Sequence, residues 1–323
     1  MKFGVLQFFS WSRRIPLEDV YRRAFERIAI MDEGGYDAVW LAEHHFSTYS
    51  VCPSVHIMGT HIAARTRNLR IGTAVSLAAM YHPLRLAEEV ALLDVLSGGR
   101  VNWGAGRGFD AREFRSFGVP PQESLERFHE AVEIVLAAWA GGPLNYQGKF
   151  WQFSDVEVLP RPLQQPHPPV WLAATSPDSV RKAAAAGYTI LMDPHATHQE
   201  IAAKRVLFDA ELRANGFSPL GREIPIARLL AVAATDQEAE AIARQGAAWT
   251  LGSYAKGPAP GSATHPDPVG RYVADVIVHG SPARVVDILT RLRAEMPMDY
   301  LLCAPLSHES FVLFTEQVLP RLL

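Results

Sequence analysis

Strand-like and helix-like segments alternate along nearly the whole chain, and this alternation restricts the fold more than any other feature. Short apolar runs of strand length are predicted at 1–9, 36–42, 69–75, 101–106, 170–174, 188–192, 224–232 and 299–304. Segments with helical periodicity of apolar residues lie between most of them. Because parallel strands are joined by right-handed crossover helices, eight such units predict a (β/α)8 TIM barrel. An open, doubly wound parallel sheet is the alternative fold.

The predicted organisation is one barrel domain over residues 1–323. Residues 144–158 break the alternation, and their pattern is typical of a hairpin inserted outside the barrel. Residues 253–270 are rich in glycine and proline and lack periodicity, so we expect either a lid loop or a disordered segment there.

The composition excludes several classes of protein. A net charge of -3 gives no electrostatic reason to expect nucleic acid or an anionic membrane as a partner. The two cysteines, Cys52 and Cys303, are too few for a disulfide framework. The apolar N-terminus meets Arg13 and Arg14 without a cleavage site, which indicates a strand and not a signal peptide. No apolar run is long enough to cross a bilayer, so we expect a cytoplasmic protein.

Glu43, His44 and His45 directly follow the predicted strand at 36–42. Barrel enzymes carry their catalytic residues at the C-terminal ends of strands. Side chains alternate between the two faces of a strand, so His44 continues the face of Trp40 towards the barrel mouth. His44 is therefore the candidate catalytic residue, and a histidine pair with a structural role is the alternative. Neighbouring side chains on opposite faces chelate poorly, and HExxH is absent, so no metal site is expected.

Two further strand ends carry groups that suit a phosphorylated ligand. In the turn 104–108 (Gly-Ala-Gly-Arg-Gly), the glycines allow close approach to the backbone and Arg107 offers a fork of donors. A tight turn with a surface arginine would explain the same residues. Ser176 precedes Pro177 and is predicted to cap a helix. The same helix start, with Thr175, presents N–H groups and hydroxyls to an anion.

A third strand end, Thr73-Ala74-Val75, consists of small side chains that could lie beneath a planar ring. Ordinary strand packing is the alternative interpretation. His82 precedes Pro83 and is expected to cap the helix that follows.

Together these motifs carry a family resemblance. In chain order they are Glu43-His44-His45-Phe46, Gly72-Thr73-Ala74-Val75, His82-Pro83-X-Arg85-X-Ala87-Glu88, Leu93-Asp94-X-Leu96-Ser97-X-Gly99-Arg100 and Gly104-X-Gly106-Arg107-Gly108. In this order the chain resembles the bacterial luciferase-like flavin-dependent monooxygenases. The resemblance is dense over residues 3–118 and weaker towards the C-terminus.

The resemblance implies a (β/α)8 barrel, usually a homodimer, that binds reduced FMN supplied by a separate flavin reductase. O2 would add at the flavin C4a atom, and the peroxyflavin would oxidise a small apolar organic substrate, such as an aldehyde, ketone or hydrocarbon. By the same resemblance, His44 assists the flavin peroxide chemistry, and a non-proline cis peptide is common near Thr73. The cofactor-binding residues implied are Thr73, Ala74, Val75, Gly106, Arg107, Ala174, Thr175 and Ser176.

Two departures from the family pattern argue against light emission. Gly106 stands where light-emitting luciferases have a cysteine, and Thr175 stands where they carry an acid. Two alternative functions remain open. One is an oxidoreductase that uses the deazaflavin F420, since that cofactor binds in related barrels. The other is a noncatalytic flavin-binding barrel.

Overall fold

The computed structural model describes residues 1–12, 14–253 and 267–323. Eight parallel strands close into a barrel, in which β12 pairs with β1 and β9 pairs with β10. The barrel strands are β1 (Lys2–Gln7), β2 (Ala38–Leu41), β3 (Arg70–Thr73), β5 (Val101–Gly106), β8 (Val170–Ala174), β9 (Thr189–Met192), β10 (Pro225–Val232) and β12 (Tyr300–Pro305). The predicted (β/α)8 barrel is confirmed, and the open-sheet alternative is wrong.

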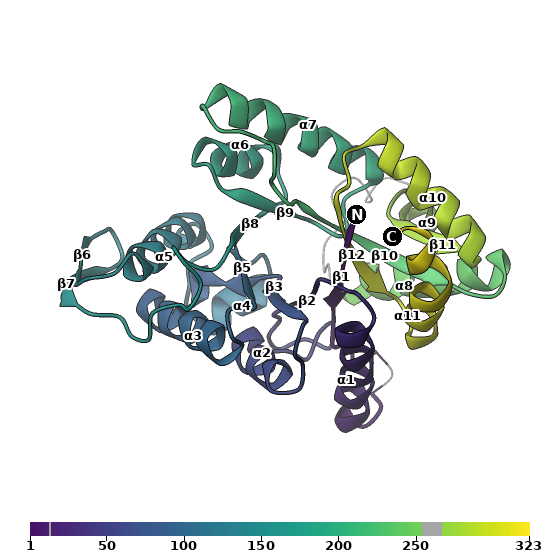
Figure 1. Ribbon diagram of the computed structural model, residues 1–323, viewed down its shortest axis with the longest axis horizontal. Helices are drawn as coiled ribbons and strands as arrows, with labels where there is room; N and C mark the ends of the chain where they lie inside the picture. The colour runs from purple at the N-terminus through teal and green to yellow at the C-terminus, as the bar shows by residue number, and fades with distance from the viewer. Residues whose placement is uncertain (13, 254–266) are drawn as a thin grey trace.

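Helices surround the strands (Figure 1). They are α1 (Leu17–Glu33), α2 (Val55–Ala63), α3 (Pro83–Leu96), α4 (Ala111–Ser116), α5 (Ser124–Trp139), α6 (Pro177–Ala185), α7 (His198–Ala214), α8 (Asp236–Ser253), α9 (Pro268–Asp275), α10 (Pro282–Glu295) and α11 (His308–Leu313). A π-helical turn at Phe314–Val318 extends α11. Within the described ranges, no helix combines the length and apolar character that a membrane span requires.

The faces of β2 follow the predicted alternation. Val39 and Leu41 belong to the apolar layer between strands and helices, whereas Trp40 fills the barrel interior. There the Trp40 Nε1–H donates to the Tyr300 hydroxyl at 3.0 Å. A Cβ on Gly72 would lie 2.2 Å from the Trp40 ring. The interior is therefore a packed core and not a pore, as in other barrels of this type.

The chain changes course after β3. The Ala74–Val75 peptide is cis, and the chain continues as β4 (Ser76–Leu77), which pairs with the end of β5. A Cβ on Gly106 would lie 2.4 Å from Val75 Cγ2. A side chain at position 106 would therefore force the Val75 side chain to move, which favours glycine there whatever a ligand requires.

A hairpin formed by β6 (Leu144–Gln147) and β7 (Gln152–Val156) lies beside α5 at the edge of the molecule (Figure 1). The buried Glu130 carboxylate on α5 accepts the backbone N–H groups of Phe150 and Trp151. His82 occupies the N-cap position of α3, but its side chain makes no capping hydrogen bond. Its ring packs against Trp151 instead, with 4.5 Å between ring centroids.

Three elements differ from the sequence expectations. The short helix α4 follows the glycine-rich turn, and β11 (Ile277–Gly280) pairs with β10. Helix α9 begins at Pro268, inside the segment 253–270 that is expected to form a lid or to be disordered. Residues 254–266 of that segment lie outside the described residues.

Candidate active site

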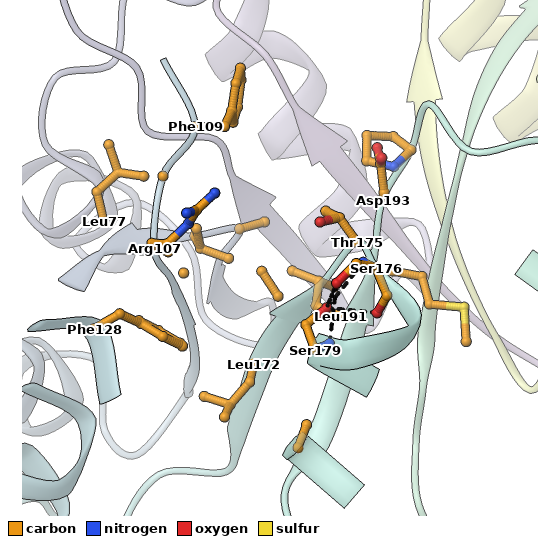
Figure 2. A pocket seen from close by; sticks show the side chains of 18 of the residues that line it. Leu77, Arg107, Phe109, Phe128, Leu172, Thr175, Ser176, Ser179, Leu191 and Asp193 are labelled. Carbon is orange, nitrogen blue, oxygen red and sulfur yellow. Dashed lines mark hydrogen bonds between the residues drawn. The ribbon is translucent and has the colours of Figure 1, made fainter. Parts of the chain in front are cut away.

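A pocket of about 460 Å³ opens at the C-terminal ends of the barrel strands. Its wall is built from the residues that follow β2, β3, β5, β8 and β9, and Figure 2 shows it from close by. The loops after barrel strands meet at this face of the fold, which is where such proteins bind ligands. The candidates that line the pocket are His44, Ala74, Val75, Gly106, Arg107, Thr175 and Ser176.

Two of the predicted residues do not line this pocket. Thr73 is fully buried, and its hydroxyl donates to the Gly104 carbonyl at 2.7 Å and accepts the Gly104 N–H at 2.9 Å. These bonds tie β3 to β5 directly behind the pocket wall. Ala174 is also fully buried and belongs to the layer between strands and helices.

The start of α6 forms one part of the pocket wall. Ser176 caps this helix, as expected: its hydroxyl accepts the Ser179 N–H, and the Ser179 hydroxyl lies within 3.0 Å of the Ser176 N–H (Figure 2). Exposed N–H groups and hydroxyls at a helix start favour an anion. Asp178 also lines the pocket, and its carboxylate pairs with Arg181 at 3.2 Å.

Arg107 lines the same pocket from the end of β5 (Figure 2). Its guanidinium makes one hydrogen bond among the described residues, a long one of 3.4 Å to Ser124. Most of its donors are therefore available to a bound anion, for which a planar guanidinium is well suited.

The fold adds two basic residues that no sequence motif indicates. Lys182 extends into the pocket wall from the second turn of α6, and His129 does so from α5. His129 Nε2 is buried and has no hydrogen-bond partner within the described part of the chain. Burial and the nearby Lys182 charge lower the pKa of His129. A buried ring nitrogen without a partner beside Arg107 and Lys182 fits a phosphate-bearing ligand better than an apolar one.

His44 lines the pocket on the side of β2. Its ring meets Tyr49 and Phe109 edge to face, with ring centroids 5.1 Å and 6.0 Å away. His44 Nδ1 lies 3.6 Å from the buried Glu113 carboxylate. His45 Nε2 instead pairs with Glu43 at 3.0 Å.

A second polar group lies beside His44. His195 lines the pocket, and its Nε2 lies 3.1 Å from the Tyr49 hydroxyl, while its Nδ1 contacts the Tyr272 hydroxyl. Burial lowers the pKa of His195 to about 4, so the imidazole is neutral near pH 7. His195 is an isolated histidine in the sequence and belongs to no recognisable motif, so the sequence alone does not identify it.

Apolar side chains form the floor of the pocket. Most of them belong to the barrel strands, and Phe8 directly follows β1. They include Leu6, Phe8, Leu172, Leu191, Ala227 and Leu302. No cluster of three or more metal-ligating side chains occurs within the described ranges. The pocket thus joins a basic, hydroxyl-rich end to an apolar interior.

Comparison with known proteins identifies the family and agrees with the fold. The model of the luciferase-like monooxygenase family matches residues 1–297, and the chain therefore belongs to this family. It is 30% identical over 232 residues to the oxygenase component of the flavin-dependent trigonelline monooxygenase of Acinetobacter baylyi, covering 71% of this chain and 64% of that protein. It is 28% identical over 192 residues to an alkanal monooxygenase alpha chain of the Kryptophanaron alfredi symbiont, covering 59% of this chain and 54% of that one.

Solved structures show the same architecture over the full length. The monooxygenase RslO1 from Streptomyces bottropensis superposes with a TM-score of 0.83 at 27% identity, covering all of both chains. The oxygenating constituent of 3,6-diketocamphane monooxygenase from Pseudomonas putida, solved in complex with FMN, has a TM-score of 0.81 at 18% identity and covers 100% of this chain and 99% of that one. The curated relatives are matched over about half to two thirds of their own length.

Proposed function

We propose that this protein is a monooxygenase that uses reduced FMN and O2 to oxidise a small apolar organic compound. The observation that carries the proposal is the pocket that joins a basic, hydroxyl-rich end to an apolar interior, with His44 in its wall. The first end suits a phosphate, and the interior suits a flat ring and an apolar substrate.

In this proposal, the phosphate of FMN binds at Arg107, Lys182 and the start of α6. The ring lies against the segment that contains the cis peptide and the end of β5. Thr73 and Ala174 act from behind the wall, because the Thr73 hydroxyl fixes β3 against β5. When bound, reduced FMN supplies the two electrons with which one atom of O2 enters the substrate and the other leaves as water. The residues assigned to contact with the cofactor are Ala74, Val75, Gly106, Arg107, Thr175 and Ser176, and Thr73 and Ala174 support this wall from behind.

His44 acts as the proton donor or acceptor of the reaction. An imidazole performs both roles, and this one lines the pocket next to the apolar floor. The apolar floor excludes water from the reacting atoms and favours an aldehyde, ketone or hydrocarbon as substrate.

The proposal includes two protein partners. A separate flavin reductase supplies reduced FMN, which is consistent with the description of one relative as an oxygenase component. The second partner is another copy of the chain. Ile57 on α2 and three apolar side chains on the adjacent α3 are exposed, and exposed apolar side chains on neighbouring helices favour a contact surface. The side chains on α3 are Leu92, Val95 and Leu96.

The experiment that tests the proposal uses a flavin reductase to generate reduced FMN and a panel of aldehydes and ketones. The His44→Ala variant should bind reduced FMN within about twofold of the wild type but lose about 100-fold in product formation. The Arg107→Ala variant is the matched comparison, since it should weaken FMN binding and recover turnover at saturating flavin. Unchanged turnover in His44→Ala would refute the role of this histidine.

Anaerobic titrations decide the cofactor. Reduced FMN should bind to the wild-type protein more tightly than reduced F420. The opposite order would favour an F420-dependent oxidoreductase. Reduced FMN that binds and consumes O2 without oxidising any compound in the panel would instead indicate a noncatalytic flavin-binding barrel.

A further inference from the structure

A buried carboxylate lies behind His44. Glu113, on α4, is only 1% exposed. Its Oε1 accepts the His45 backbone N–H at 2.9 Å and lies 3.6 Å from His44 Nδ1. Its Oε2 is buried and lacks a hydrogen-bond partner in the described part of the chain. A buried carboxylate is costly unless donors or cations compensate its charge, so one N–H donor is a poor match for this group.

We propose that Glu113 is the positioning residue of His44, and this inference rests on the proposed role of His44 in proton transfer. By attracting the proton to Nδ1, Glu113 fixes the imidazole tautomer and leaves Nε2 as the nitrogen that serves the pocket. When His44 takes up a second proton, the same carboxylate stabilises the imidazolium. A distance of 3.6 Å is too long for a hydrogen bond. At this distance the carboxylate charge still attracts a proton to the nearer ring nitrogen, Nδ1, without a hydrogen bond.

The neighbouring carboxylate, Glu43, shows the contrasting arrangement. Its Oε1 contacts His45 Nε2 at 3.0 Å and accepts the Tyr81 hydroxyl at 2.9 Å, and its Oε2 accepts the Leu77 N–H at 3.3 Å. Both oxygens of Glu43 are thus engaged in holding the wall of the pocket together. Glu113 keeps its Oε2 without such a bond, and its Oε1, which accepts the His45 N–H, lies within ion-pair distance of the His44 ring at 3.6 Å.

The position of Glu113 also links the two halves of the site. Helix α4 begins a few residues after Arg107, so Glu113 follows the turn that is proposed to hold the phosphate. Its bond to His45 N–H attaches that turn to the loop after β2. One side chain therefore connects the turn that would hold the phosphate to the loop that carries His44.

The test is a nitrogen-15 NMR spectrum of the full-length protein labelled at histidine, with the His44 signals assigned from a His44→Gln variant. In the wild type, His44 should carry its proton on Nδ1. Glu113→Gln is nearly isosteric and keeps an oxygen for the His45 N–H, but it should convert His44 to a mixture of tautomers. Glu113→Asp keeps the charge and should retain more of the wild-type tautomer than Glu113→Gln.

Activity supplies the second measurement. Glu113→Gln should lower kcat at least about tenfold, because a misplaced tautomer impairs proton transfer, and should change reduced FMN affinity less than about twofold. Glu130→Gln is the matched control, since it also removes a buried carboxylate that accepts backbone N–H groups, and this carboxylate forms no ion pair with a histidine among the described residues. This control should leave the His44 tautomer unchanged.

An unchanged His44 tautomer in Glu113→Gln would overturn the inference, whatever the activity. The NMR measurement needs neither flavin nor turnover, so the two proposals fail separately. A tautomer that changes in a protein without monooxygenase activity would support the link between Glu113 and His44 and refute the proposed function. Loss of activity in His44→Ala, with no tautomer change in Glu113→Gln, would refute only the inference about Glu113.

Discussion

Gly106 places the end of β5 directly against Val75, where any Cβ would collide. The added carbon in Gly106→Ala would lie 2.4 Å from Val75 Cγ2, and Val75 lines the pocket. We expect the variant to lose about 1–3 kcal/mol of unfolding free energy through overpacking and to bind reduced FMN more weakly. Urea unfolding and flavin titration measure the two effects.

Gly252→Ala is the control for this substitution. Gly252 lies in α8 with open space around its Cα, so alanine there should be neutral or stabilising by up to about 1 kcal/mol. Equal losses of stability in the two variants would show that Val75 does not constrain position 106.

The site residues divide into those that short motifs reveal and those that only the fold brings together. His44, Arg107 and Ser176 each follow a strand, so their meeting at the barrel mouth is predictable from the sequence. His129 and His195 are isolated along the chain, and no local pattern distinguishes them from other histidines. Lys182 gives no signal either, because it lies in the last turn of α6, where the helix dipole favours a cation in any case.

At the level of elements, two capping boxes allow the ligand role of a helix start to be separated from its structural role. Ser176 caps α6 at the pocket, and Thr197 caps α7 with the same reciprocal hydrogen bonds. Alanine at either position should cost about 1 kcal/mol of stability through loss of the cap. Ser176→Ala should also weaken reduced FMN binding, whereas Thr197→Ala should not. Equal flavin affinity in both variants would exclude Ser176 as a phosphate contact.

The sequence predicts the elements with a recognisable burial pattern but not the short elements that lack one. Long periodic helices and the apolar barrel strands are visible because their burial pattern repeats. The short elements α4 and β11 have too few residues for a period. β3 and β4 are separated at Ala74–Val75, where the peptide bond is cis, a local geometry that no apolar pattern encodes.

At the level of the whole molecule, the exposed apolar side chains of α2 and α3 define the expected dimer contact. Ile57 is 75% exposed, and Val206 on α7 is similarly exposed at 69%. We expect Ile57→Asp to shift the protein from dimer to monomer, because a charge in a contact must be desolvated. Val206→Asp should leave the dimer intact. Sedimentation velocity over a range of concentrations measures both variants, and a wild-type protein that is monomeric throughout would refute the proposed dimer.

The folded state also depends on two histidines that are held neutral beside one buried cation. Arg228 is buried, and its Nη1–H donates to the Ala196 carbonyl at 2.8 Å and lies 3.3 Å from His198 Nδ1. Because the guanidinium can only donate, His198 Nδ1 must accept and cannot hold a proton. Burial and the Arg228 charge lower the pKa of His198 to about 4, and burial lowers the pKa of His195 to about 4.

These lowered pKa values predict that acid destabilises the whole barrel. The loss should begin at pH values higher than those at which most carboxylates titrate. The unfolded chain takes up a proton at each histidine near pH 6.5, whereas the folded chain does so only near pH 4. The free energy of unfolding should therefore be constant above about pH 7 and fall as the pH drops through this window. The loss is at most roughly 3 kcal/mol for each histidine. Urea unfolding at a series of pH values measures the slope, and His198→Gln, which keeps an acceptor for Arg228, should make it shallower. A slope as steep in the variant as in the wild type would show that His198 is already protonated in the folded protein.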